Sequence, residues 1–383
     1  MRLRPFLSYK RKHKTKVVAL KNELRVHGAG GWRDLDDLLP GEEQTPGFRV
    51  AINSTTGGFI WYGTPESAAS DYINTNELPV AAARKRRDPA YPLVPLFVTA
   101  DPSALMDRVG ADLSARDFKT FSECNGEVRG RQPYAAFHRH VARRYVRAAL
   151  AALDQQRFTV AATAMSEPSG AHDVTLDWRD LVPERTRLLV PGAEDTVRSA
   201  LANLRDGVQP KADFPEIVLD VNLPLALATL LGYEWRVTTG LALTVRQRTG
   251  SGLLVVAGDG PVHDDWPDWT EHTLGGGGPT VIAVSTTADP LAAAFDAYAR
   301  EHHAERILGL HAPGVLDDAG VRGLARHVAS KVRSVQVDGI ERHLLLAGPV
   351  SLATLIGAAS NGNGPVVVPL WTGTQYESAV TVG

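Results

Sequence analysis

Two carboxylates in one short segment near the amino terminus are the first candidates for chemistry. The segment GTPESAASDYINTNELPVAA covers residues 63–82, directly after the apolar run GGFIWY, and contains Glu66 and Glu77. A carboxylate can act as an acid, as a base or as a stabiliser of developing positive charge. Glu66 falls in the predicted first helical turn, where the helix dipole favours a negative charge. Taken alone, Glu77 is best interpreted as an ordinary solvated surface charge.

The elements that must position this segment alternate between strands and helices. Apolar runs predict strands over residues 4–9, 57–64 and 91–99. Helical spacing of apolar residues and high alanine content predict helices over residues 10–24 and 134–156. Residues 114–133 are expected to be a loop with a short strand. Such alternation predicts an α/β fold with a parallel sheet covered on both faces, and Pro92 and Pro95 would then lie near a strand end or edge.

The second half of the chain contains four units, each predicted to be a strand followed by a loop and a helix. The four units cover residues 187–204, 279–302, 306–332 and 343–359. They predict two Rossmann-like halves, with β-like material over residues 235–258 between the first two units. The segment TEHTLGGGGPT is expected to be a flexible loop rather than a phosphate-binding fingerprint. We place the domain boundary between Leu153 and Phe158, which gives domains 1–154 and 158–383.

The composition of the chain narrows the possible classes of protein and of binding partner. The chain has 383 residues, of which 44% are hydrophobic and 22% charged, and a formal net charge of −2, so neither nucleic acid nor membrane is favoured as a partner. The single cysteine, Cys124, excludes an intrachain disulfide and a cysteine-based zinc site. No apolar stretch reaches the roughly 20 residues of a membrane helix. We expect a cytoplasmic protein.

No histidine pair has the spacing of a metal site. His138 and His140, and the adjacent His302 and His303, are not four residues apart, so we expect no metal. The amino-terminal basic run is best interpreted as a solvated helix face, although such runs can bind phosphate-rich ligands. Binding of long nucleic acid through this run is the weakest alternative, and it would show as a salt-dependent affinity.

Four stretches follow one another in the first 100 residues: RPFLSYKRKHKTKVVALKNEL, GWRDLDDLLPGEE, FIWYGTPESAASDYINTNELP and YPLVPLFV. Together they resemble the successive segments of a TIR domain. In this family a first strand ends in a Ser-Tyr pair, a second strand ends at an aspartate before the mobile BB loop, and a helix carries a serine, an aromatic residue and a Glu-Leu pair. The matching positions are Ser8, Tyr9, Asp34, a BB loop from Leu35 to Pro46, Ser70, Tyr72, Glu77 and Leu78. The interval from Ser70 to Glu77 is one residue longer than in the family pattern.

The TIR resemblance implies either an adaptor or an enzyme that cleaves NAD+ between nicotinamide and ribose, with the helix glutamate as the essential group. Glycosidic cleavage passes through an oxocarbenium-like state. Nicotinamide leaves as a neutral base, so one carboxylate without a general acid is sufficient. The resemblance therefore assigns catalysis to Glu77, with NAD+ as substrate and no cofactor. It implies NAD+-binding residues Phe6, Ser8, Tyr9, Lys10, Trp32, Asp34 and Trp61, and BB-loop assembly residues Asp36, Asp37, Leu38 and Leu39.

Two stretches of the second half are distinctive: EIVLDVNLPLALATLLGYEWRVTTGLALTVRQR and HLLLAGPVSLATLIGAASNGNGPVVVPLWTGTQYESAV. On these stretches residues 158–383 resemble the SAVED domain, a sensor of cyclic oligonucleotides built from two fused CARF-like halves. A helix beginning at Ser351 would offer free N–H groups to a phosphate, and aromatic rings would stack on bases. The expected ligand-binding residues are Arg236, Arg246, Arg248, Pro349, Ser351, Trp371 and Tyr376. The alternative is that Trp371 belongs to the core and the arginines are exposed strand residues.

TIR followed by SAVED resembles the effectors of CBASS, the cyclic-oligonucleotide-based anti-phage signalling systems. The resemblance implies a latent NADase that a cyclic oligonucleotide activates, and cyclic tri-adenylate is the ligand we expect. Binding would stack protomers head to tail into an oligomer or filament, in which one BB loop completes the NAD+ pocket of a neighbour. The product, ADP-ribose or a cyclised form, stays open. The alternative is a non-catalytic TIR scaffold that assembles on nucleotide binding and recruits a partner.

Overall fold

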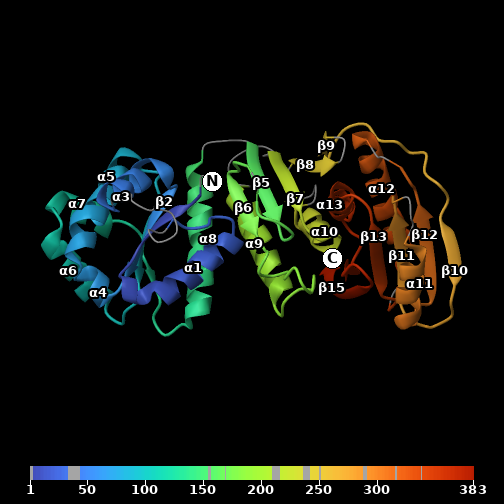
Figure 1. Cartoon of the computed structure of the whole chain (residues 1–383), viewed down its shortest axis with the longest axis horizontal. Coiled ribbons are helices and arrows are strands. Elements are labelled where there is room, and N and C mark those ends of the chain that lie inside the picture. The colour runs from blue at the N-terminus through green and yellow to red at the C-terminus, as the bar shows by residue number, and fades with distance from the viewer. Residues whose placement is uncertain are drawn as a thin grey trace. The chain divides into compact units, whose positions relative to one another are not determined.

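The computed structural model shows two compact units (Figure 1). The structure describes residues 3–32, 44–153, 157–168, 170–208, 216–235, 242–249, 252–287, 291–314, 317–337 and 339–383. The first unit comprises Met1–Gln155, Ala171–Leu176 and Asp206–Pro210. The second comprises Gln156–Gly170, Asp177–Arg205 and Lys211–Gly383. The two short segments that join the first unit were not anticipated from the sequence.

The first unit is built on a parallel sheet in the order β1-β2-β3-β4. Its strands are β1 (Pro5–Ser8), β2 (Gly58–Gly63), β3 (Leu93–Phe97) and β4 (Glu127–Val128). Trp32 makes a parallel bridge to Phe6 on the side of β1 away from β2. With the Trp32 segment counted as the neighbour of β1 on that side, the order of the strands is that of a flavodoxin-like fold. The three strands expected from the apolar runs are confirmed.

Ten helical segments surround this sheet among the described residues. They are η1 (Arg11–His13), α1 (Lys14–Val26), α3 (Gln44–Val50), η2 (Ala51–Thr55), α4 (Pro65–Ala68), η3 (Ile73–Glu77), α5 (Leu78–Arg87), α6 (Pro102–Asp112), α7 (Ala115–Ser122) and α8 (Tyr134–Ala152). The helices expected over residues 10–24 and 134–156 are confirmed. The short strand expected within residues 114–133 is confirmed as β4. The loop expected before it is wrong over Ala115–Ser122, because Ser114 caps helix α7 there by accepting the N–H of Asp117 at 3.2 Å.

Pro95 lies inside β3 rather than at a strand end. It is tolerated because β4 pairs with β3 only from Leu96 onward, so at Pro95 that side of β3 has no strand neighbour and behaves as an edge.

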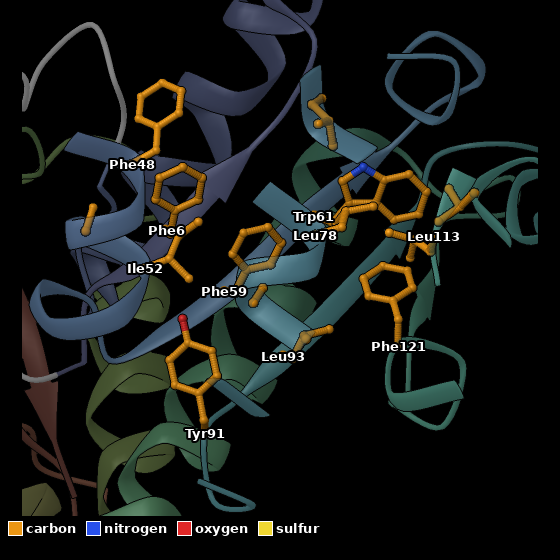
Figure 2. Close-up of a cluster of buried hydrophobic side chains, with 14 of the residues drawn as sticks. Phe6, Phe48, Ile52, Phe59, Trp61, Leu78, Tyr91, Leu93, Leu113 and Phe121 are labelled. Atoms are coloured by element: carbon orange, nitrogen blue, oxygen red, sulfur yellow. The ribbon is translucent and has the colours of Figure 1, made fainter. Parts of the chain in front are cut away.

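An aromatic cluster holds the carboxyl end of β1 in place (Figure 2). The ring of Phe6 stacks on Trp32 and Phe59, with centroids 4.7 and 5.4 Å apart, and meets the edge of Phe48 at 5.7 Å. Figure 2 shows Phe6 between Phe48 and Phe59, which come from α3 and β2. These contacts fix the backbone that leads to Tyr9 and Lys10.

The second unit is built on two sheets, and most of one terminal strand, β6, is grouped with the first unit. One has the order β6-β5-β7-β8-β9 and the other the order β10-β12-β11-β13-β14-β15. The strands of the first are β5 (Arg157–Thr163), β6 (Val174–Asp177), β7 (Glu216–Asn222), β8 (Ala242–Thr249) and β9 (Gly252–Ala257). Those of the second are β10 (Thr270–Thr273), β11 (Thr280–Ser285), β12 (Arg306–His311), β13 (Arg342–Ala347), β14 (Val366–Trp371) and β15 (Tyr376–Val382). The central strands of both sheets are parallel, as expected for Rossmann-like halves.

Five helices accompany these sheets among the described residues: α9 (Ala193–Val208), α10 (Leu225–Glu234), α11 (Ala292–Glu301), α12 (Asp318–Ser334) and α13 (Val350–Ala359). Helices α10 and α13 follow β7 and β13, and they carry the near-identical stretches LATLLG and LATLIG. This internal repeat marks the two halves as structural equivalents. The strand expected at residues 187–190 is wrong, because Arg187 has a left-handed backbone, with φ of 55°, and Pro191 follows the segment.

The loop expected over residues 270–280 is confirmed for its glycine-rich part and wrong at its start, where Thr270–Thr273 form strand β10. Hydrogen bonds tie the glycine-rich segment 275–278 to residues 303–305. The N–H groups of Gly276 and Gly278 donate to the carbonyls of Ala304 and His303 at 3.2 and 2.9 Å. A Cβ on either glycine would lie within 2.5 Å of the His303 carbonyl oxygen, so side chains are excluded by close approach.

Candidate functional site

A cavity of about 270 Å³ opens at the carboxyl end of β1 and contains Glu77. Among the described residues it is lined by Phe6, Leu7, Tyr9, Lys10, Arg11, Phe48, Ser70, Tyr72, Ile73 and Glu77. The carboxyl ends of parallel strands are the usual ligand-binding edge of open α/β sheets. The volume of the cavity lies just below the range for small-molecule sites, about 300–1,000 Å³.

Glu77 reaches this cavity through an irregular helix. Residues Ile73–Glu77 form a π-helical turn before α5 begins at Leu78. A π turn accommodates one more residue than an α turn, and such turns are frequent at functional sites. The extra residue between Ser70 and Glu77 is therefore absorbed, and both residues still line the same cavity. Glu77 is only 6% exposed.

The other carboxylate of the segment has a different environment. Glu66 pairs with Lys12 and with His13, whose Nε2 lies 3.1 Å from Glu66 Oε2. The hydrogen bond from Lys12, followed by that from His13, lowers the pKa of Glu66 to about 2. Glu66 is not among the described residues that line the Glu77 cavity. It ties the start of α4 to the basic run instead.

Two cationic residues line the cavity together with Glu77. Lys10 and Arg11 line it, and Lys10 Nζ donates to Ser70 Oγ at 3.4 Å. Ammonium and guanidinium groups bind phosphate oxygens well. The arrangement thus places one carboxylate and two cations around a space suited to a sugar–phosphate ligand.

The predicted NAD+-binding residues separate into three groups. Phe6, Tyr9 and Lys10 lie on the cavity with Glu77. Ser8 and Trp32 are buried beside it, 1% and 4% exposed, without lining it. Trp61 is fully buried against Phe97 and Phe121 in the core, so a place for its ring in the pocket is not supported (Figure 2). Asp34 and the BB-loop residues Asp36, Asp37, Leu38 and Leu39 lie outside the described residues.

Sequence reasoning did not name four residues that line the cavity, which are Leu7, Arg11, Phe48 and Ile73. Arg11 could have been found, because it directly follows Lys10 at the strand end. Phe48 could not, because only the long-range packing of α3 on Phe6 brings it there.

In the second unit, the amino terminus of α13 is already occupied by a side chain. Pro349 precedes the helix, and the N–H and Oγ of Ser351 both donate to Gln247 Oε1, at 3.0 and 2.8 Å. Ser351 is fully buried. Two donors therefore converge on one oxygen acceptor at the position where a phosphate was expected.

The remaining predicted ligand-binding residues are less accessible or not described. Tyr376 is 4% exposed and donates its hydroxyl to the Leu346 carbonyl at 2.9 Å, so this ring is a core residue rather than an open stacking surface. Burial also raises its pKa. Trp371 is half-buried, and the centroid of its ring lies 4.9 Å from that of Tyr376. Arg246 is half-buried on β8. Arg236 and the side chain of Arg248 lie outside the described part of the chain.

Neither a metal site nor a membrane span is found in the described part of the chain. Its histidine, cysteine and acidic side chains form no group of three that could hold a metal ion. None of its helices combines the length and apolar character needed to cross a bilayer.

The repeated strand–helix halves define the second unit as a Rossmann-like α/β fold. Residues 200–382 match the family described as "SMODS-associated and fused to various effectors sensor domain". This part of the chain is therefore a SAVED domain. Among curated proteins, none matches the sequence.

Two similar solved structures are those of the Acinetobacter baumannii Cap4 SAVED/CARF-domain containing receptor, with the cyclic trinucleotides 3'3'3'-cAAA and 2'3'3'-cAAA. Each is 13% identical with a TM-score of 0.50, and the match covers 89% of this chain and 84% of the receptor. At this identity the likeness concerns the fold, and it supports a SAVED/CARF-like architecture.

Proposed function

We propose that this chain is a CBASS effector in which a cyclic oligonucleotide, bound by the SAVED domain, activates NAD+ cleavage by a TIR-like first unit. The SAVED match over residues 200–382 carries the sensor half of this proposal. The two similar receptor structures contain cyclic tri-adenylates, which makes that ligand class the first to test.

The Glu77 cavity carries the catalytic half. A buried carboxylate beside a space bordered by Lys10 and Arg11 fits a substrate with a ribosyl cation-like transition state and a pyrophosphate. Glu77 stabilises the charge that develops on the ribose while nicotinamide leaves as a neutral base. Lys10 and Arg11 pair with phosphate oxygens and fix the ribose against Glu77.

The modest volume of the cavity supports control by assembly. A cavity of about 270 Å³ is small for a dinucleotide, so part of the NAD+ site must be supplied or opened by a further element. A neighbouring protomer that completes the site would exclude water and keep the isolated chain inactive. A head-to-tail contact of this kind is heterologous and can extend into a filament.

A panel of cyclic oligonucleotides, mixed with the full chain and NAD+, tests both halves together. Nicotinamide release and particle mass are followed in the same samples. The proposal predicts that one messenger, with cyclic tri-adenylate first in order, produces nicotinamide and larger assemblies. Assembly without loss of NAD+ supports the scaffold alternative, and neither response to any messenger contradicts the sensor assignment.

A further inference from the structure

Asn74 is a buried amide inside the π-helical turn η3, which leads to Glu77. Its side chain is 1% exposed, and its Nδ2 donates to two acceptors, the Ala68 carbonyl at 2.8 Å and Asp112 Oδ2 at 2.7 Å. Ala68 is the last residue of α4 and Asp112 the last of α6, so one amide ties the turn to both helices. The bond to Asp112 is charge-assisted and therefore among the stronger kinds of hydrogen bond.

Helix α4 is itself fixed to the sheet, at the carboxyl end of β2. Ser67 Oγ donates to the Tyr62 carbonyl at 3.0 Å and accepts the N–H of Thr64 at 2.7 Å. Thr64 and Ser67 form a capping box, which satisfies N–H groups at the start of the helix. Both side chains are buried. A continuous path of hydrogen bonds therefore connects β2 through α4 to Asn74.

The local sequence makes the turn before α5 irregular. Pro79 has no N–H, and inside a regular α-helix its ring would meet the carbonyl four residues earlier. The helix is wider at this point, because the N–H of Leu78 donates to the Ile73 carbonyl five residues earlier rather than to that of Asn74. Since π geometry is rare, contacts from outside the helix are needed to keep the turn in one arrangement.

We propose that Asn74 is a positioning residue, which keeps the turn in the arrangement that holds the Glu77 carboxylate in the cavity. This inference rests on the proposed function, because it assigns Asn74 a role in the catalysis attributed to Glu77. Both neighbours of the amide are acceptors, so only its NH₂ group can face them.

The acceptor of the same amide separates positioning from stability. No described group donates to Asn74 Oδ1. A buried acceptor without a donor costs stability, so an apolar side chain of similar size would avoid that cost. Such a side chain could not tie the turn to α4 and α6. Replacing Asn74 by leucine is therefore expected to affect turnover much more than stability.

Steady-state kinetics of NAD+ cleavage by the full chain, with an activating cyclic oligonucleotide, test the role. Asn74→Leu should lower kcat about 100-fold and leave KM within about twofold, because a displacement of about 1 Å has that effect on a reacting group. The melting temperature should stay within about 4 °C of the wild type. Asn76→Leu is the matched control, since the Asn76 amide donates only to the adjacent Thr75 among the hydrogen bonds of the described residues. An unchanged kcat, or a loss of turnover that follows a large loss of stability, would overturn the inference.

An exchange of the two side chains tests the contact itself. Asn74→Asp places two carboxylates against each other and should lower kcat at least as much as Asn74→Leu. Adding Asp112→Asn supplies a donor to the carboxylate at position 74, so the double variant should recover at least about tenfold of the lost kcat. A double variant no better than Asn74→Asp would contradict the role of this hydrogen bond.

Crystal structures of the wild type and of Asn74→Leu, both without NAD+, decide the inference independently of activity. With the strands of the first sheet superposed, the Glu77 carboxylate should move by about 1 Å or more in the variant. A carboxylate that stays in place would overturn the inference even if the chain is an active enzyme. If the wild type cleaves no NAD+ with any messenger, the proposed function is wrong, and the position of Glu77 still shows whether Asn74 holds the turn.

Discussion

Gly232 on α10 and Thr354 on α13 are in backbone contact: a Cβ added to Gly232 would lie 1.8 Å from the Thr354 carbonyl oxygen. The repeat makes the contact reciprocal, because a Cβ on Gly357 would lie 2.0 Å from the Thr229 carbonyl oxygen. The two halves of the SAVED domain are therefore joined by a helix pair whose spacing is set by two equivalent glycines.

Alanine at either glycine is expected to destabilise the SAVED domain. In an exposed helix, Gly→Ala would raise stability by up to about 1 kcal/mol, so the sign of the effect separates packing from helix propensity. Gly232→Ala and Gly357→Ala should each lower the free energy of unfolding by about 3 kcal/mol, since the obstructing atoms are backbone. Urea unfolding of both variants measures this. A harmless substitution at either position would show that the helices separate easily.

Gln247 is expected to compete with the nucleotide for Ser351. If a ligand phosphate takes the two donors of Ser351, Gln247 must first release them. Gln247→Ala should then tighten binding of cyclic tri-adenylate by about five- to tenfold, while Ser351→Ala should weaken it. Isothermal titration calorimetry gives both values, with the exposed Gln375→Ala as the control. Weaker binding by Gln247→Ala would instead make Gln247 a ligand contact.

Acid should destabilise the first unit through His27. Its ring is fully buried, and burial, followed by Arg143 and Arg139, lowers its pKa to about 3. His27 Nε2 lies 4.0 Å from Glu23 Oε2, but the low pKa of His27 keeps its ring neutral, so we do not count this contact as an ion pair. The unfolded chain binds a proton near pH 6.5 and the folded chain does not. The contribution of neutral His27 to the free energy of unfolding is therefore complete above pH 6.5, and it is lost as the pH falls toward the pKa of the folded state.

Between pH 7 and pH 5 this linkage should lower the free energy of unfolding by about 2 kcal/mol. His27→Leu should reduce that loss, because no proton can be taken up at this position on unfolding. Part of the acid sensitivity will remain, since burial also lowers the pKa of His138 to about 4. Chemical unfolding at the two pH values measures the difference. If His27→Leu lost as much free energy of unfolding between the two pH values as the wild type, His27 would not be the source of the acid sensitivity.

Local sequence patterns were sufficient for the elements that depend on neighbours along the chain. Apolar runs located β1, β2 and β3, and alanine-rich periodicity located α8. The repeat of α10 and α13 was also visible in the sequence as LATLLG and LATLIG.

Features that depend on distant contacts could not be predicted. Phe48 reaches the cavity through packing on Phe6, and Tyr376 becomes a core residue because its hydroxyl finds the Leu346 carbonyl. Gln247 reaches Ser351 from 104 residues away. The one-residue excess between Ser70 and Glu77 was visible in the sequence, but only the fold shows that a π turn absorbs it.

The most direct test of the enzyme account is nicotinamide release by the full chain with NAD+ and an activating cyclic oligonucleotide. Glu77→Gln is compared with Glu66→Gln, which changes the other carboxylate of the same segment outside the described lining of the cavity. Messenger binding is measured in parallel to show that both variants still sense the nucleotide. The account predicts that Glu77→Gln loses at least about 100-fold in turnover while Glu66→Gln stays within a few-fold of the wild type. Undiminished turnover in Glu77→Gln would contradict it.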